Sequence, residues 1–407
     1  MEKKQHSIFH IMGILLLGIA IAGINPYQSS GEEVHKASSH SEIETAMELI
    51  DTSKPMARFT YDSGLSFEYP DAVRGIYVTG PSAGGERFNS LVDLVETTDL
   101  NAMVIDIKED HGEVTVKLDE DSPYADVSRN YIHDPRKLLE TLEEKGIYPI
   151  ARIVVFKDTL LAEKHPEWSF TQNGKVWTNG KGEGFVSPYQ KEVWEYNVEL
   201  AKQAAEWGFQ EIQFDYVRFP EGFETRDEDL EYDRGDFKDF DGNNIKRRVA
   251  AVTGFVEYAK NELDYYGVDM AVDIFGYTAT IEEAPGIGQN FLQIADNVDV
   301  ISSMIYPSHW TSYFGIEFPD KEPYKLVTEY AKKENELLGQ LDVPPTTRPW
   351  IQDFDAPWLY SGEPTFHYGK KEVEAQIKAL NENGIDEFLL WNSGNVFTEG
   401  VDYTPLD

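Results

Sequence analysis

One pattern occurs eight times from residue 74 onward, and it constrains the fold more than any other feature. Each repeat has a β-rich apolar run, a polar loop, and then, after the first seven runs, a stretch with the apolar spacing of an amphipathic helix. The predicted strands span residues 74–79, 102–108, 148–156, 211–219, 268–277, 298–306, 348–353 and 385–391. The predicted helices span residues 88–98, 135–145, 188–207, 244–266, 289–295, 323–338 and 370–382. This alternation predicts a (β/α)8 TIM barrel, an α/β fold with enlarged loops after the strands.

The connections are unequal in length, and this asymmetry indicates where a site would lie. Short turns join the helices to the strands that follow them, with Gly208, Gly267 and Gly384 where a helix C-cap is expected. Long, aromatic-rich segments follow the strands instead. Because active sites of TIM barrels are built from the loops after the strands, we expect the functional residues at the strands' carboxyl ends.

The N-terminal region has the pattern of an export signal. Lys3 and Lys4 precede an apolar run over residues 8–24. The run is short for a membrane-spanning helix, yet an uncleaved anchor stays open. We therefore expect a signal peptide or N-terminal membrane anchor in residues 1–30, a polar linker in 31–70, and the barrel domain in 71–407. The barrel is then extracellular or on the cell surface, with a possible membrane tether.

The charge of the chain disfavours several classes of partner. With 36 basic and 73 acidic residues, the formal net charge is −37. Such an excess repels nucleic acid, phosphorylated metabolites and anionic membrane surfaces. A neutral or cationic substrate is therefore expected. The chain has no cysteine, so its stability outside a cell does not rest on disulfides.

Two aspartates stand inside apolar strand patterns. Asp215 interrupts the fourth predicted strand, where an ionised carboxylate is costly unless it is paired or hydrogen-bonded. Arg218 is close enough in sequence to pair with it, or to hold a substrate. Asp273 has a similar position in the fifth predicted strand. The structural alternative for Asp215 is a cap of the next helix or an ion pair with Arg218.

A pair of carboxylates on neighbouring barrel strands, near Trp and Tyr residues, favours glycoside hydrolysis. One carboxylic acid protonates the leaving oxygen, and the other carboxylate acts as nucleophile or activates water. Aromatic faces can stack on sugar rings, while polar side chains bind hydroxyl groups. The predicted catalytic residues are Asp215 and Asp273. The predicted substrate-binding residues are Tyr77, Asp106, Arg152, Arg218, Tyr306, His309, Trp350, Gln352 and Trp391.

Some of these residues have an equally physical structural role. Asp106 is expected to brace Arg152 or a lysine rather than to take part in chemistry. Asp273 could be an acid/base or a hydrogen-bonded support. Trp350 and Trp391 could be sugar platforms or part of the core at the top of the barrel.

No cofactor or metal is expected. The nine histidines form neither a His-x-His pair nor a His-Glu-x-x-His motif, which disfavours a metal-dependent hydrolase. The acidic loop over residues 221–241 is interpreted as a solvated excursion. Its run over residues 239–243 matches a calcium-binding loop only loosely. His309, alone in a loop, could simply be hydrogen-bonded.

Four stretches carry a resemblance to a known family: RGIYVT at 74–79, AMVIDIK at 102–108, QFDYVRFP at 213–220 and MIYP at 304–307. With them the chain resembles a family of glycoside hydrolase barrels found in bacteria, distantly similar to the α-amylase type. The resemblance runs from residue 74 almost to the end, and it implies a barrel and a carbohydrate substrate.

The amylase-like enzymes also imply roles for individual residues. Their nucleophile is an Asp at the end of strand four, which corresponds to Asp215. Their acid/base is a Glu at the end of strand five, where this chain has Asp273. The resemblance therefore leaves the second role open to Asp273, Asp106 or a group on strand seven.

Two hypotheses follow. The first is a secreted or surface-anchored glycoside hydrolase acting on an extracellular or cell-wall polysaccharide, with Asp215 as nucleophile or base and Asp273 as acid. The alternative is a non-catalytic carbohydrate-binding barrel that uses the same aromatic platforms.

Overall fold

Eight parallel strands close into a barrel in the computed structural model, which describes residues 60–359 and 364–406. β1 pairs with β2 on one side and with β13 on the other, so the barrel has no open edge. The barrel strands are β1 (Arg74–Val78), β2 (Ala102–Lys108), β5 (Tyr148–Val154), β8 (Glu211–Asp215), β9 (Asp269–Phe275), β10 (Val300–Met304), β12 (Trp350–Gln352) and β13 (Phe388–Trp391). The predicted (β/α)8 barrel is confirmed.

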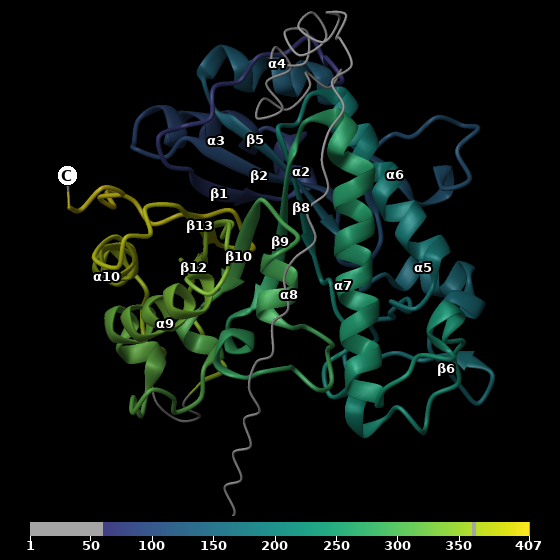
Figure 1. The fold of residues 1–407 in the computed structure, drawn as a ribbon. Helices are drawn as coiled ribbons and strands as arrows, with labels where there is room; N and C mark the ends of the chain where they lie inside the picture. The colour runs from purple at the N-terminus through teal and green to yellow at the C-terminus, as the bar shows by residue number, and fades with distance from the viewer. Residues whose placement is uncertain (1–59, 360–363, 407) are drawn as a thin grey trace, which may run out of the picture. The chain divides into compact units, whose positions relative to one another are not determined.

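Helices surround these strands, and Figure 1 shows α6 and α7 side by side along one flank. The helices are α2 (Gly80–Ala83), α3 (Arg87–Glu96), α4 (Pro135–Lys145), α5 (Thr159–Lys164), α6 (Lys191–Trp207), α7 (Asn244–Leu263), α8 (Phe291–Ala295), α9 (Pro323–Leu338) and α10 (Lys370–Asn381). The predicted helix-terminating glycines have left-handed backbones, with φ of 119° at Gly208, 66° at Gly267 and 76° at Gly384. This conformation reverses the chain tightly at little steric cost, because glycine has no Cβ.

Short strands elaborate the loops that follow the barrel strands. β3 (Val114–Val116) and β4 (Ser128–Ile132) extend the sheet beside β2, inside a segment that we predicted to be a long loop. β6 (Thr171–Gln172) and β7 (Lys175–Val176) form a separate hairpin, and β11 (Thr346–Thr347) pairs with β10.

The fourth barrel strand is shorter than predicted. We expected it to continue to Phe219 and to end at Pro220, but β8 ends at Asp215. The cause is Tyr216, whose backbone has a φ of 52° and so leaves the extended conformation at once. The residues from Tyr216 to Pro220 are therefore part of the loop above the barrel, and this change of direction shapes the site.

At the lower end of the barrel, where the barrel strands begin, an arginine lies between two carboxylates and closes the interior. Arg348 lies 2.7 Å from Glu211 and 2.7 Å from Glu387, and Arg348 and Glu211 are fully buried. Tyr69 reaches the same cluster, because its hydroxyl donates to Glu387 at 2.8 Å and accepts from Arg348 at 2.9 Å. Residues 60–70, which we predicted to be the end of a linker, thus belong to the same compact unit as the barrel.

The predicted export signal, residues 1–30, lies outside the described residues. Within the described ranges, no helix has both the length and the apolar character to cross a membrane.

Candidate active site

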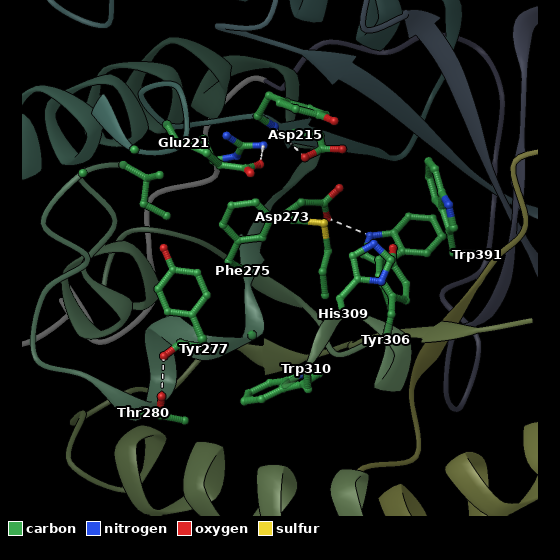
Figure 2. A pocket seen from close by; sticks show the side chains of 18 of the residues that line it. Asp215, Glu221, Asp273, Phe275, Tyr277, Thr280, Tyr306, His309, Trp310 and Trp391 are labelled. Carbon is green, nitrogen blue, oxygen red and sulfur yellow. Dashed lines mark hydrogen bonds and ion pairs between the residues drawn. The ribbon is translucent and has the colours of Figure 1, made fainter. Parts of the chain in front are cut away.

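A cavity of about 970 Å³ opens at the carboxyl ends of the barrel strands. Figure 2 shows it from close by, with side chains from several strands and loops converging on it. The predicted site residues that line it are Tyr77, Arg152, Asp215, Arg218, Asp273, Tyr306, His309, Trp350 and Trp391. The barrel therefore brings together residues that are up to about 300 positions apart in the chain.

Asp215 is held rigidly at the base of this cavity. Its Oδ2 accepts hydrogen bonds from Arg152, at 3.1 Å from Nε and 2.6 Å from Nη2, and its Oδ1 accepts from the Tyr216 N–H at 2.5 Å. The chain then turns at Tyr216, whose left-handed backbone is a conformation that costs a non-glycine residue free energy. The charged donor and the backbone donor together fix the orientation of the Asp215 carboxyl group.

Arg152 is shared by two carboxylates. Its Nη1 donates to Asp106 at 2.6 Å, and Asp106 also accepts a hydrogen bond from the Tyr77 hydroxyl. Asp106 is buried below the cavity wall, so it braces Arg152, as its structural alternative predicted. The structure does not place it where it would contact a substrate.

Two other predictions differ from the observed contacts. Arg218 is not the cation that pairs with Asp215; it pairs with Glu221 at 3.2 Å, and it lies over the rings of Tyr216 and Phe275. The reason is the turn at Tyr216, which carries Arg218 away from the end of the strand. Gln352, predicted to bind substrate, is buried behind the wall, where its amide bonds the Ser308 N–H and the Phe354 carbonyl.

Asp273 lies next to Asp215 on the neighbouring strand. Phe214 pairs with Val272 in the sheet register, so the following residues of β8 and β9 stand beside each other. Burial raises the pKa of Asp273 well above its ordinary value, and the charge of Asp215 raises it further, against the opposing effect of Arg152. The Trp350 indole N–H donates to Asp273 Oδ1 at 2.8 Å. The surroundings of Asp273 therefore favour its protonated form, and Figure 2 shows its carboxyl group close to that of Asp215.

Aromatic rings form one wall of the cavity. Tyr77 and Trp391 are stacked, with ring centroids 4.1 Å apart, and Trp350 meets Trp391 edge-on at 5.5 Å. The Arg152 guanidinium lies 5.5 Å from the Tyr77 ring centroid and 5.4 Å from that of Trp391. Trp350 is only 1% exposed and supports Asp273, whereas Trp391 keeps part of its surface open to the cavity.

Several residues that line the cavity are not among the predicted site residues. Glu221, Tyr277 and Trp310 line the cavity, although the segment that begins with Glu221 was interpreted as a solvated loop. The position of Glu221 could have indicated that it lines the cavity, because this residue directly follows the motif of the fourth strand. Further along the same loop, Asn243 caps α7 by accepting from the Lys246 N–H at 2.9 Å. In the part of the chain that the structure describes, no group of three or more His, Cys, Asp or Glu residues is arranged to hold a metal ion.

Comparisons with known proteins agree with this geometry. A family model described as "Putative glycosyl hydrolase domain" matches residues 75–397. The structure of the PgaB (BpsB) glycoside hydrolase domain from Bordetella bronchiseptica is similar, with 14% identity and a TM-score of 0.55, and the match covers 79% of this chain and 94% of that one. At this identity the likeness supports the barrel fold alone.

Two further solved structures are similar over parts of the chain. A hypothetical protein from Ruminiclostridium thermocellum ATCC 27405 is 32% identical with a TM-score of 0.41, covering 49% of this chain and 96% of that one. The α-galactosidase TtGalA from Thermus thermophilus, in complex with stachyose, is 12% identical with a TM-score of 0.47, covering 83% and 64%. No curated protein sequence matches the chain.

Proposed function

The chain belongs to this family of glycosyl hydrolase domains, and from that premise we propose that it hydrolyses an extracellular or cell-wall polysaccharide with the carboxyl pair Asp215 and Asp273. The observation that carries the assignment is the contrast between these two neighbouring groups. Asp215 accepts three hydrogen bonds from Arg152 and the backbone, whereas burial and the neighbouring Asp215 raise the pKa of Asp273 well above its ordinary value. Carboxyl groups whose environments separate their protonation states in this way serve as base and acid in many enzymes.

The proposed chemistry needs both states at once. The Asp273 carboxyl donates its proton to the glycosidic oxygen as the bond to the anomeric carbon breaks. Asp215 either forms a bond to that carbon, to be replaced later by water, or removes a proton from a water molecule that attacks the carbon directly. Arg152 orients Asp215, and Asp106 holds Arg152 in place.

The two carboxylates that the sequence left open for the acid role, Asp106 and a group on the seventh strand, fit it less well. Asp106 is engaged by Arg152 and by the Tyr77 hydroxyl below the cavity wall. Asp353, which follows the seventh strand, accepts hydrogen bonds from the backbone N–H and the hydroxyl of Thr398. Asp273 therefore takes the second role, at the position where the amylase-like enzymes have a glutamate.

The nature of the substrate follows from charge and from the aromatic wall. Trp391, which is partly exposed and lines the cavity, offers an apolar ring suited to a sugar, and the strongly acidic chain favours a neutral or cationic glycan over an anionic one. Lys3, Lys4 and the apolar run that follows support export of the barrel. We therefore place the reaction outside the cell or at its surface as part of the proposal.

A hydrolysis screen tests the proposal. The full chain and its Asp215→Asn variant are incubated with neutral and amino-sugar polysaccharides, and released reducing ends are measured. Sugar release by the wild type alone would support catalysis by Asp215, whereas equal release by both would remove Asp215 from the mechanism. Binding without release on any glycan would favour the non-catalytic carbohydrate-binding barrel.

A further inference from the structure

Trp358 is a large aromatic side chain that the fold leaves open to solvent. It lies in the loop after β12, and 61% of its surface is exposed. Single exposed hydrophobic residues are common and carry no meaning alone. Trp358, however, is the outer end of a continuous series of ring contacts that begins inside the cavity.

The contacts lead outward in two short steps. The Tyr306 ring, in the cavity wall, lies 5.3 Å from the His309 ring and 5.8 Å from the Phe354 ring. Each of these rings then meets Trp358, His309 at 6.2 Å and Phe354 at 6.3 Å. The Phe354 and Trp358 planes differ by 27°, so the indole is stacked on Phe354, and 61% of the Trp358 surface stays exposed.

We propose that Trp358 is a sugar-binding subsite outside the cavity, which holds a unit of the polysaccharide remote from the bond that is cleaved. The inference rests on the proposed function and deepens it, because it makes a polymer, rather than a disaccharide, the substrate. A flat apolar indole face presents a large contact area with few rotatable bonds, so binding a sugar ring costs little side-chain entropy.

Hydrogen bonds hold this subsite in a fixed position. The Gln352 amide accepts from the Ser308 N–H at 3.0 Å and donates to the Phe354 carbonyl at 2.9 Å. It thereby ties the loop that carries His309 to the loop that carries Trp358. Gln352 is thus a positioning residue for the subsite, which explains a buried polar side chain that does not line the cavity.

The opposite side of the cavity also offers exposed rings. Tyr277 lines the cavity, is 38% exposed, and is stacked on Phe275 with ring centroids 5.7 Å apart. Figure 2 shows Tyr277 and His309 on opposite sides of the carboxyl pair. A glycan chain can therefore extend in both directions from the site of cleavage, as binding to an internal stretch of a polymer requires.

The test compares Trp358→Ala with Tyr265→Ala. Tyr265 is 57% exposed, but it precedes β9 and so lies at the other end of the barrel. Both changes are made in the full chain carrying Asp215→Asn, so that no probe is consumed. Affinity electrophoresis in gels containing hydroxyethyl cellulose, laminarin or chitosan selects the glycan, and calorimetry with its oligosaccharides of two and six units follows.

We expect Trp358→Ala to bind the six-unit oligosaccharide about tenfold more weakly, the scale of one aromatic stacking contact, and to bind the two-unit one as Tyr265→Ala does. Trp358→Phe keeps a ring and should recover most of the affinity. Equal affinity of all variants for the six-unit ligand would overturn the subsite, as would an equal loss on both ligand lengths or no binding to any of the three glycans.

These binding measurements, taken with the hydrolysis screen, separate this inference from the proposed function. If the Asp215→Asn chain binds glycans with the expected Trp358 dependence but the wild type releases no sugar, the subsite stands and hydrolysis does not. If it releases sugar and Trp358 has no effect on length dependence, hydrolysis stands and the subsite does not.

Discussion

Replacing Asp273 by asparagine should lower kcat but raise the stability of the folded protein at alkaline pH. The effect on catalysis can therefore be told apart from an effect on folding. Asparagine has the same shape, and its amide oxygen can still accept the 2.8 Å hydrogen bond from the Trp350 indole. The variant loses only the acidic proton. General acid catalysis contributes about 10²- to 10⁴-fold in rate, so kcat should fall by that factor, which corresponds to roughly 3–5 kcal/mol in the activation barrier.

The effect on stability follows from the raised pKa of Asp273. Between the unfolded and the folded pKa, the folded protein binds the extra proton, so this group destabilises the fold progressively as the pH rises. The asparagine variant has no such proton to lose. It should therefore unfold at the same temperature as the wild type in acid, below the unfolded pKa, and at a higher temperature at pH 8.

Activity profiles and thermal unfolding of the same samples check both expectations. Wild-type kcat/KM should fall as the pH rises through the pKa of Asp273, because the acid must be protonated, and the variant should lack this alkaline limb. The matched control is Asp269→Asn, on the same face of β9 and about 13 Å along the strand. A variant with wild-type kcat, or a control that loses as much activity, would refute the assignment.

Three further predictions concern stability. Arg152→Gln leaves two buried carboxylates without their cation, and it should cost about 3–5 kcal/mol in urea unfolding as well as the activity; a loss under 1 kcal/mol would contradict the ion-pair geometry. Burial raises the pKa of Glu334 to about 7, so the contribution of this group to the free energy of unfolding should fall by about 3 kcal/mol as the pH rises from 4 to 8, and Glu334→Gln should lose less stability than the wild type over this range. Tyr69→Phe removes the hydroxyl that bonds Arg348 and Glu387, and should cost about 1 kcal/mol with unchanged kcat; a fall in kcat would show that the lower cluster affects the site.

The sequence predicted the barrel and the position of Asp215 at the end of the fourth strand because both depend on local pattern. From residue 74 onward, the alternation of strands and helices, with glycines at the helix ends, can be recognised from short stretches of sequence. Asp215 was recognisable because a carboxylate inside an apolar strand has to be compensated. Its partner was not recognisable. The sequence suggested Arg218, three positions away, but the cation is Arg152 on β5, which the register of the sheet brings beside β8.

The contacts of the loop residues were not predicted either, because they also depend on tertiary structure. The path of the chain after β8 depends on the left-handed backbone of Tyr216. A tyrosine side chain does not predict a positive φ. That turn sends Arg218 to Glu221 and brings Glu221 to the cavity. Trp358 was missed because its role depends on the position of His309, on another loop. Contacts between loops are set by tertiary packing rather than by local propensity.

The two ends of the barrel show why position, and not chemistry alone, identifies the site. At each end an arginine binds two buried carboxylates: Arg152 at the upper end and Arg348 at the lower. β8 contributes to both clusters, through Asp215 and Glu211. Burial raises the pKa of Glu211 to about 7, so a perturbed carboxyl occurs at the lower end too. A shifted pKa therefore does not distinguish the clusters.

The two clusters differ in whether a substrate can reach them. The Glu211 and Arg348 side chains have no exposed surface, and Tyr69 is hydrogen-bonded into their cluster, so a substrate cannot reach them. Asp215 faces the open cavity among aromatic rings. In a TIM barrel the same kind of ion cluster can thus stabilise the fold at one end and prepare a carboxylate for reaction at the other, and the loops decide which. The Asp273 and Asp269 variants, on one strand that spans both ends, test this distinction directly.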